Sequence, residues 1–143
     1  MIEDSNIFLV DTNVLVYAFS HEQDSKNEKA RELLDKCWDG HIRLAVSNQN
    51  FAEFAFVSMN KAKLEGREIT VAIGQIVYFN GFKKVNYSPQ TVLLAIEIAN
   101  EFRTSFWDAL LAATMKEHHI THIYTENTKD FKMPWIKAVN PFK

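Results

Sequence analysis

Four acidic side chains of this 143-residue chain stand beside or within apolar segments, where a lone charge is costly: Asp11, Glu53, Asp108 and Asp130. Asp11 directly follows the run FLV, and Glu53 lies inside FAEFAFVSM. A carboxylate near buried surface needs a hydrogen-bond donor, an opposite charge or a metal ion. The four acids are therefore candidates for structural roles taken singly, or for metal ligands taken together.

Two of these acids have a structural explanation at the start of a helix. Asp11 precedes TNVLVYAF, and Asp is favoured at the position that caps a helix N-terminus. Asp108 follows Ser105 by three residues, which is the spacing of a capping box. The helix dipole at such a position favours the ionised carboxylate. Capping and metal binding are therefore compatible roles.

Glu53 and Asp130 differ in how readily a structural role explains them. The helix predicted around Glu53 is apolar almost all round, and such a helix is normally buried. A buried Glu53 would be protonated, paired in a salt bridge or bound to a metal. Asp130 lies in the loop TENTKDF, where a turn involving Asn127 would account for it. Glu126 in the same loop could take the place of Asp130.

The segments that would position these acids alternate between strands and helices. Four short runs of β-forming residues predict strands, with a candidate fifth at the end, over residues 7–10, 42–46, 83–87, 122–125 and 136–140. Helical spacing of apolar residues predicts helices over residues 12–19, 25–38, 49–62, 69–82, 89–103 and 105–119. This alternation predicts a three-layer α/β/α fold, with helices on both faces of a four- to five-stranded parallel sheet.

Such a sheet would bring the four acids to one edge, because open α/β folds bind ligands at the carboxyl ends of their strands. Carboxylates about 6 Å apart repel one another by about 3 kcal/mol per pair at an effective dielectric of about 20. A cluster of acids therefore needs a cation. A ligand set made only of oxygen suits Mg²⁺ or Mn²⁺ rather than zinc or copper.

The composition is that of an ordinary globular protein, with 47% hydrophobic and 24% charged residues, and predicts one domain over residues 1–143. A net charge of −2 argues against nucleic-acid binding through bulk charge. Withdrawing four acids into a metal site would leave 14 acidic residues against 16 basic ones, which weakens that objection. The 11 Phe, three Trp and four Tyr hint at a surface for self-association.

The cellular setting follows from the cysteine count and the apolar runs. Cys37 is the only cysteine, so an intrachain disulfide is excluded, and its helical spacing places it in the core. The N-terminus lacks the basic and apolar regions of a signal peptide, and no run approaches the length of a membrane span. We expect a cytoplasmic protein without a membrane segment.

Other chemistry is less well supported by the sequence. The histidines of EHHITH fall at a helix end and a strand start, which argues against a shared zinc site: His118, His119 and His122. Four basic residues are candidates for phosphate contacts or for a solvated surface: Lys61, Lys63, Arg67 and Lys116. The sequence contains no P-loop, no dinucleotide fingerprint and no serine nucleophile elbow.

The segments VDTNVLVYAF, SFWDALLAA and YTENTKDF occur in this order along nearly the whole chain, with an acid at position 53 between the first two. Together they resemble the PIN-domain ribonucleases, and among these the VapC-type toxins of prokaryotic toxin–antitoxin pairs. The resemblance implies that Asp11, Glu53 and Asp108 are the principal carboxylates, with Asn13 supporting Asp11.

The last motif departs from part of that family. Some members carry Asp where this chain has Asn127, whereas others have the form T-x-N-x-x-D-F, which this chain matches. The resemblance therefore assigns the fourth acid to Asp130, with Glu126 as a substitute, and implies that Thr125 and Asn127 shape the loop.

The resemblance further implies an endoribonuclease that uses Mg²⁺ or Mn²⁺ to cleave RNA phosphodiester bonds, as the toxin of a type II toxin–antitoxin system. Its expected partners are RNA, a small antitoxin and a second copy of the chain. One alternative is a PIN-like module that binds RNA or protein with little catalysis. Another is a metal-dependent phosphohydrolase of small phosphate esters, although an aspartyl-phosphate enzyme would usually have a second acid where Asn13 stands.

Overall fold

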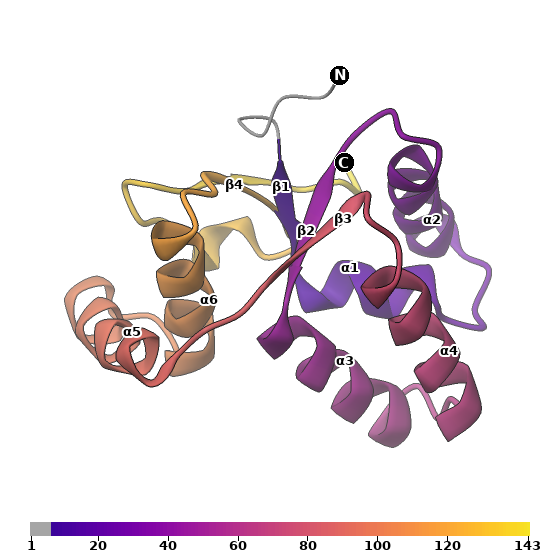
Figure 1. Ribbon diagram of the computed structural model, residues 1–143, viewed down its shortest axis with the longest axis horizontal. Helices are drawn as coiled ribbons and strands as arrows, with labels where there is room; N and C mark the ends of the chain where they lie inside the picture. Colours follow the sequence, from indigo (N-terminus) through magenta and orange to yellow (C-terminus); the bar gives the residue numbers. More distant parts are fainter. Residues whose placement is uncertain (1–6) are drawn as a thin grey trace.

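The computed structural model describes residues 7–143, and these form a five-stranded parallel sheet between two layers of helices (Figure 1). The strands are β1 (Phe8–Val10), β2 (Leu44–Ser47), β3 (Phe82–Val85), β4 (His122–Tyr124) and β5 (Lys137–Val139). Their order is β3-β2-β1-β4-β5, and every neighbouring pair is parallel. The predicted α/β fold is confirmed, including the candidate fifth strand.

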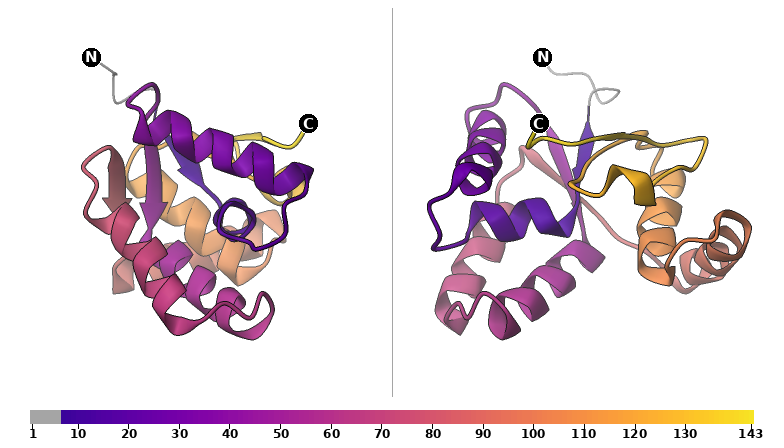
Figure 2. Two further views of the ribbon diagram at one scale, coloured as in Figure 1. Left: turned by 90° about the vertical axis from the view of Figure 1, so that its right-hand side faces the viewer. Right: turned by 180° about the vertical axis from the view of Figure 1, so that it is seen from behind.

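Helices cover both faces of this sheet (Figures 1 and 2). They are α1 (Thr12–Ala18), α2 (Ser25–Trp38), α3 (Asn48–Asn60), α4 (Gly66–Val77), α5 (Pro89–Phe102) and α6 (Phe106–Glu117), with a short 3₁₀ helix, η2 (Thr128–Asp130), after β4. The first four α-helices lie on one side of the sheet, and α5 and α6 lie on the other. None of the helices in residues 7–143 is long and apolar enough to cross a membrane.

The strands supply both cores because successive side chains of a strand point to opposite faces. Leu9 packs into the cluster that contains α5 and α6, whereas Val10 packs into the cluster beneath α1 to α4. In β2, Leu44 and Val46 join the second cluster, and Ala45 joins the first. All five side chains are fully buried. Apolar residues at consecutive strand positions are what a sheet covered on both faces requires.

The predicted elements agree with the structure to within two residues at each end, except for the helix predicted over 69–82. That helix begins at Gly66 and ends at Val77, because Phe82 starts β3. The Phe82 ring packs against Trp38 with ring centroids 4.8 Å apart. A Cβ at Gly81 would collide with the ring of Phe79. Packing and a tight turn therefore override the helical spacing of the apolar residues.

The prediction that α3 is buried all round is wrong. Phe54 is buried, but the side chains of Phe56 and Met59 are 64% and 62% exposed. Glu53 is half-buried at the border between these two environments. Its carboxylate therefore faces a hollow that solvent can reach, and not a closed core.

Candidate active site

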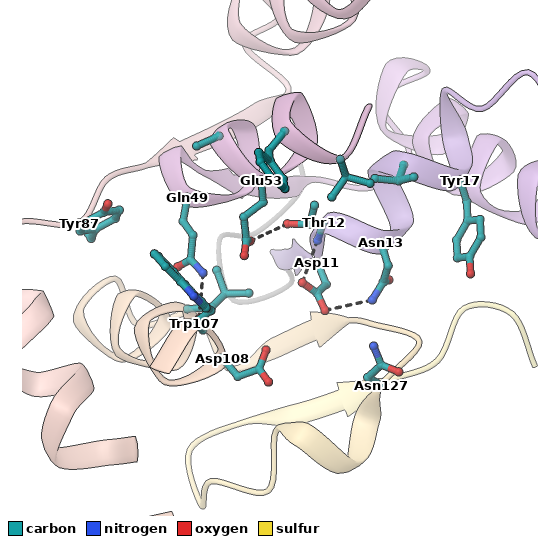
Figure 3. A pocket seen from close by; sticks show the side chains of 15 residues that line it. Asp11, Thr12, Asn13, Tyr17, Gln49, Glu53, Tyr87, Trp107, Asp108 and Asn127 are labelled. Atoms are coloured by element: carbon teal, nitrogen blue, oxygen red, sulfur yellow. Dashed lines mark hydrogen bonds between the residues drawn. The ribbon is translucent and has the colours of Figure 1, made fainter. Parts of the chain in front are cut away.

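A pocket of about 820 Å³ opens where β1 and β2 end and where α1, α3 and α6 approach one another (Figure 3). Its volume lies within the range of about 300–1,000 Å³ that is usual for ligand sites. Three of the four predicted acids line it: Asp11, Glu53 and Asp108. Each comes from a different part of the chain, so the parallel sheet brings together side chains that are distant in sequence.

Asp11 is held at the C-terminal end of β1 by several donors. It caps α1, and its Oδ1 accepts a hydrogen bond of 2.8 Å from the backbone N–H of Thr12. Its Oδ2 accepts from the hydroxyl of Thr125 at 2.7 Å and from Nδ2 of Asn13 at 3.2 Å. Asp11 is thus a helix cap that also faces the pocket. Asn13 and Thr125, both predicted from the family resemblance, contact it directly.

Glu53 is positioned by a network that the sequence analysis did not foresee. Its Oε1 accepts a hydrogen bond of 2.9 Å from the hydroxyl of Thr12. That hydroxyl accepts in turn from Nδ2 of Asn50 at 3.0 Å, while Oδ1 of Asn50 accepts from the backbone N–H of Ser47 at 3.0 Å. Ser47 and Asn50 form the capping box of α3, and their three-residue spacing could have identified them. The cap of α3 thereby connects Glu53 to the start of α1.

Asp108 lies in the first turn of α6, where Ser105 is the cap and its Oγ accepts from the backbone N–H of Asp108 at 3.1 Å. Gln49 joins this turn to α3, because its Nε2 donates a hydrogen bond of 2.8 Å to the carbonyl of Trp107. The Gln49 side chain is buried, and its Oε1 has no hydrogen-bond partner within residues 7–143. Nothing in the sequence pattern pointed to Gln49.

Burial raises the pKa of each of the three pocket acids above its ordinary value. Repulsion between acids raises the pKa further: Glu53 and Asp130 act on Asp11, Asp108 acts on Glu53, and both Asp11 and Asp130 act on Asp108. Hydrogen bonds from neighbouring polar groups oppose this rise without cancelling it. The negative charge of the pocket is therefore poorly compensated by the protein.

No Lys, Arg or His of the described chain lines the pocket. Within residues 7–143, His21 forms a hydrogen bond with Glu68, and Lys26 forms an ion pair with Glu126, so neither contact involves a pocket acid. Glu126 also accepts a hydrogen bond of 2.8 Å from the hydroxyl of Tyr17. The carboxylate of Glu126 therefore has two partners, and Glu126 does not line the pocket.

Asp130 lies beside the pocket and does not line it. It ends η2, its side chain is half-buried, and its backbone N–H donates to the carbonyl of Asn127 at 3.0 Å. Asn127 does line the pocket, and its backbone N–H donates to Oγ1 of Thr125 at 3.1 Å. The loop after β4 therefore places Asn127 at the pocket wall and Asp130 close enough for its charge to act on Asp11 and Asp108.

The donor chemistry of the pocket fits Mg²⁺ or Mn²⁺, because the charged groups are carboxylates and the other polar groups are hydroxyls and amides. Within residues 7–143, however, no three His, Cys, Asp or Glu side chains lie close enough together to enclose one ion. The predicted phosphate-contacting residues lie elsewhere, since none of them lines the pocket: Lys61, Lys63, Arg67 and Lys116.

Comparison with solved structures finds the same fold in bacterial toxin–antitoxin proteins. A toxin–antitoxin complex from Klebsiella pneumoniae shares 22% identity with a TM-score of 0.67, covering 94% of this chain and 97% of that one. DNA-bound VapBC from Salmonella typhimurium shares 18% identity with a TM-score of 0.64, covering 99% of each chain. VapC20 of Mycobacterium tuberculosis, described as a toxin that cleaves the sarcin–ricin loop, shares 18% identity with a TM-score of 0.62, covering 83% of this chain and 88% of that one.

No relative among curated proteins matches the chain significantly. The family model of the PIN domain, by contrast, matches residues 8–133, a span that begins with β1 and includes all three pocket acids. Because this match covers most of the sequence, the chain belongs to the PIN domain family.

Proposed function

We propose that this PIN domain is an endoribonuclease that depends on Mg²⁺ or Mn²⁺ and serves as the toxin of a type II toxin–antitoxin pair. One observation carries the proposal: Asp11, Glu53 and Asp108 line a single pocket that contains no basic side chain of the described residues. A site with uncompensated negative charge favours a divalent cation. RNA is the proposed substrate because VapC20, which has the same fold, is described as cleaving the sarcin–ricin loop.

In this proposal, Asp11 and Asp108 hold the ion, with Asp130 adding negative charge from the adjoining loop. When bound, the ion would lower the pKa of a coordinated water and stabilise negative charge on the scissile phosphate. Glu53 has a pKa raised by burial and by Asp108, so its carboxylate is suited to orient the attacking water and accept its proton. Thr12 orients Glu53 through the hydrogen bond from its hydroxyl.

The direct test is RNA cleavage by the purified protein with Mg²⁺ or Mn²⁺, with EDTA, and after Asp11→Asn. We expect cleavage that EDTA stops and that Asp11→Asn lowers by at least about 100-fold, because metal-assisted catalysis contributes several kcal/mol to the transition state. Glu126→Gln is the matched control, since it also removes an acid from the same sheet edge, and it should retain most activity. Cleavage that survives Asp11→Asn would point to another site or a contaminant and would end the proposal.

The two alternatives give different results in the same experiment. A metal-dependent phosphohydrolase of small esters would use the same metal ion to bind a terminal phosphate. It would hydrolyse a substrate such as p-nitrophenyl phosphate and leave RNA intact. A binding module would retain RNA or protein binding with no metal-dependent turnover.

The exposed apolar side chains support the proposed antitoxin and second protomer. Large apolar residues of α3, α4 and the turn after α4 are exposed, and so are two on α5: Phe56, Met59, Val71, Val77, Tyr78, Leu93 and Ile96. Among these residues, Met59, Val77 and Tyr78 line one open groove formed by α3 and α4, and exposed apolar patches of this kind mark protein contacts. These faces are the proposed sites for both partners.

A further inference from the structure

Aromatic side chains surround the pocket acids, and the proposed metal chemistry does not use them. They are Tyr17, Phe56, Tyr87 and Trp107. In Figure 3, Trp107 and Tyr87 lie to one side of the carboxylates, and Tyr17 lies on the opposite side. The Trp107 side chain is 58% exposed although it is the immediate neighbour of Asp108. A large flat side chain is therefore presented to the pocket directly beside a proposed metal ligand.

Trp107 is held in this position by contacts on the protein side. Its carbonyl accepts the 2.8 Å hydrogen bond from Gln49, which fixes the first turn of α6 against α3. Its ring meets the ring of Phe106 edge-on, with centroids 5.2 Å apart and an interplanar angle of 77°. The backbone of Trp107 is thus fixed, and a Trp side chain has only two torsions, so it loses little conformational entropy when it binds a ligand.

The charge of the pocket limits how it can recognise RNA. With no basic side chain of the described residues in the lining, the phosphates next to the scissile one have no cationic partner there. Proteins that bind single strands combine a positively charged groove with aromatic side chains on which unpaired bases stack. Among the described residues, the lining of this pocket supplies only the aromatic part. Every base has a flat face, so a stacking contact requires an unpaired nucleotide and no particular sequence.

We propose that Trp107 stacks on an unpaired nucleobase next to the scissile phosphate, which makes Trp107 a base-contacting residue of this pocket. This inference rests on the proposed ribonuclease function. A base inside a duplex is stacked and paired on both sides, and it is therefore excluded from this contact.

The test is binding of a fluorescein-labelled, mixed-sequence RNA octanucleotide in Mg²⁺. All proteins carry Glu53→Gln, which removes the proposed proton acceptor but keeps Asp11 and Asp108, so that the RNA stays intact. The second ligand is the same octanucleotide with abasic sugars at its four central positions, and the third is the sequence as a perfect duplex. Trp107→Ala should weaken binding of the single strand about 5- to 100-fold and leave binding of the abasic strand unchanged. The wild-type Trp107 protein should bind the duplex more weakly than the single strand.

Substitutions of graded shape separate stacking from a general apolar contact. Trp107→Phe should retain most of the affinity, whereas Trp107→Leu should lose it, because only the former keeps an aromatic face. Leu93→Ala is the matched control, since Leu93 is 65% exposed on α5 and does not line the pocket. It should bind every ligand as the parent protein does.

Tryptophan fluorescence gives a second measurement that does not depend on the folding of the alanine variant. The single strand should quench the fluorescence of the parent protein, and this quenching should disappear in Trp107→Phe. Stacking is refuted if Trp107→Ala weakens the intact and abasic strands equally, if leucine replaces tryptophan without loss, or if the quenching persists in Trp107→Phe. Failure of the ribonuclease proposal would appear separately, as the absence of metal-dependent RNA cleavage by the unsubstituted protein.

Discussion

Two sets of carboxylates lie near the same edge of the sheet: Glu126 alone, and the pocket acids Asp11, Glu53 and Asp108. Their surroundings shift their pKa values in opposite directions. Glu126 forms an ion pair with Lys26 and accepts a hydrogen bond from Tyr17. The contact with Lys26 lowers the pKa of Glu126 below its ordinary value of 4.5. Burial and mutual repulsion instead raise the pKa of the pocket acids, represented by Asp11 and Asp108.

The contrast shows that the lack of a basic partner in the pocket is a property of that pocket and not of this end of the molecule. Lys26, in the first turn of α2, reaches Glu126, so basic side chains are available nearby. Clustered groups with shifted pKa values and no compensating charge are typical of functional sites. The uncompensated acids are therefore the ones that we expect to bind a cation.

The largest effect that separates the two sets should be metal-dependent stability. An ion that binds only the folded protein stabilises it by about 2.7 kcal/mol at 100 times its Kd. For a domain of this size we expect Mn²⁺ at that excess to raise the Tm by roughly 5–10 °C. Asp11→Asn and Asp108→Asn should each remove most of this increase, as measured by differential scanning calorimetry.

Glu126→Gln provides the control for that measurement. It removes one negative charge from the same edge of the sheet, but from a carboxylate that already has partners. Its metal-induced rise in Tm should match that of the unsubstituted protein. An equal loss in Glu126→Gln and Asp108→Asn would mean that Mn²⁺ responds to overall charge, and the distinction between the two sets would fall.

A smaller effect is expected from Gln49, which holds the α3 side of the pocket against α6. Its side chain donates to the carbonyl of Trp107, and a hydrogen bond from it lowers the pKa of Glu53. Gln49→Leu loses these bonds but also removes a buried Oε1 that has no partner within residues 7–143. We therefore expect little change in stability and a 10- to 100-fold loss of Mn²⁺ affinity, as is usual when a group that orients a ligand is removed.

Ser58 is a matched control on the same helix. Its Oγ is also buried without a hydrogen-bond partner in the described chain, and it lies outside the pocket. Ser58→Ala should leave the Mn²⁺ affinity unchanged in a calorimetric titration. If both variants lose affinity equally, the rigidity of α3 would be the cause, and the specific contacts of Gln49 would not.

The sequence predicts much of this arrangement because strand ends and helix starts have strong local signals. The apolar run before Asp11 and the Ser105 cap before Asp108 locate both acids at element boundaries, and the parallel sheet then brings these boundaries together. The fold class and most element bounds follow from the same periodicities. Such signals depend on residues that are close together along the chain.

What could not be predicted depends on contacts between distant segments. The link from Gln49 to Trp107 and the pairing of Lys26 with Glu126 join residues 58 and 100 positions apart. Apolar composition also predicted a buried α3, whereas Phe56 is exposed. The helical pattern does not show which face will meet the core, because that depends on how the sheet and the neighbouring helices pack.

The smallest effect concerns pH, and its sign follows from the lowered pKa of Glu126. A carboxyl whose pKa is lower in the folded protein contributes stability that is fully present above its ordinary pKa of 4.5. That contribution is lost as the pH falls through the lowered folded value. The Tm difference between the unsubstituted protein and Glu126→Gln should therefore be on the order of 1 °C at pH 6 and should disappear towards pH 3, because partly exposed ion pairs contribute little.

The pocket acids do not obscure this comparison, because both proteins contain them and their contribution cancels in the difference. Their own effect has the opposite sign: a carboxyl whose pKa is raised by burial binds its proton more tightly in the folded state, so acid favours folding at those positions. Lys26→Met should reproduce the pH profile of Glu126→Gln, since either change removes the same ion pair. A Tm difference that grows as the pH falls would show that Lys26 does not stabilise the ionised Glu126. Glu126 would then no longer serve as the charge-compensated acid in the comparison with the pocket acids.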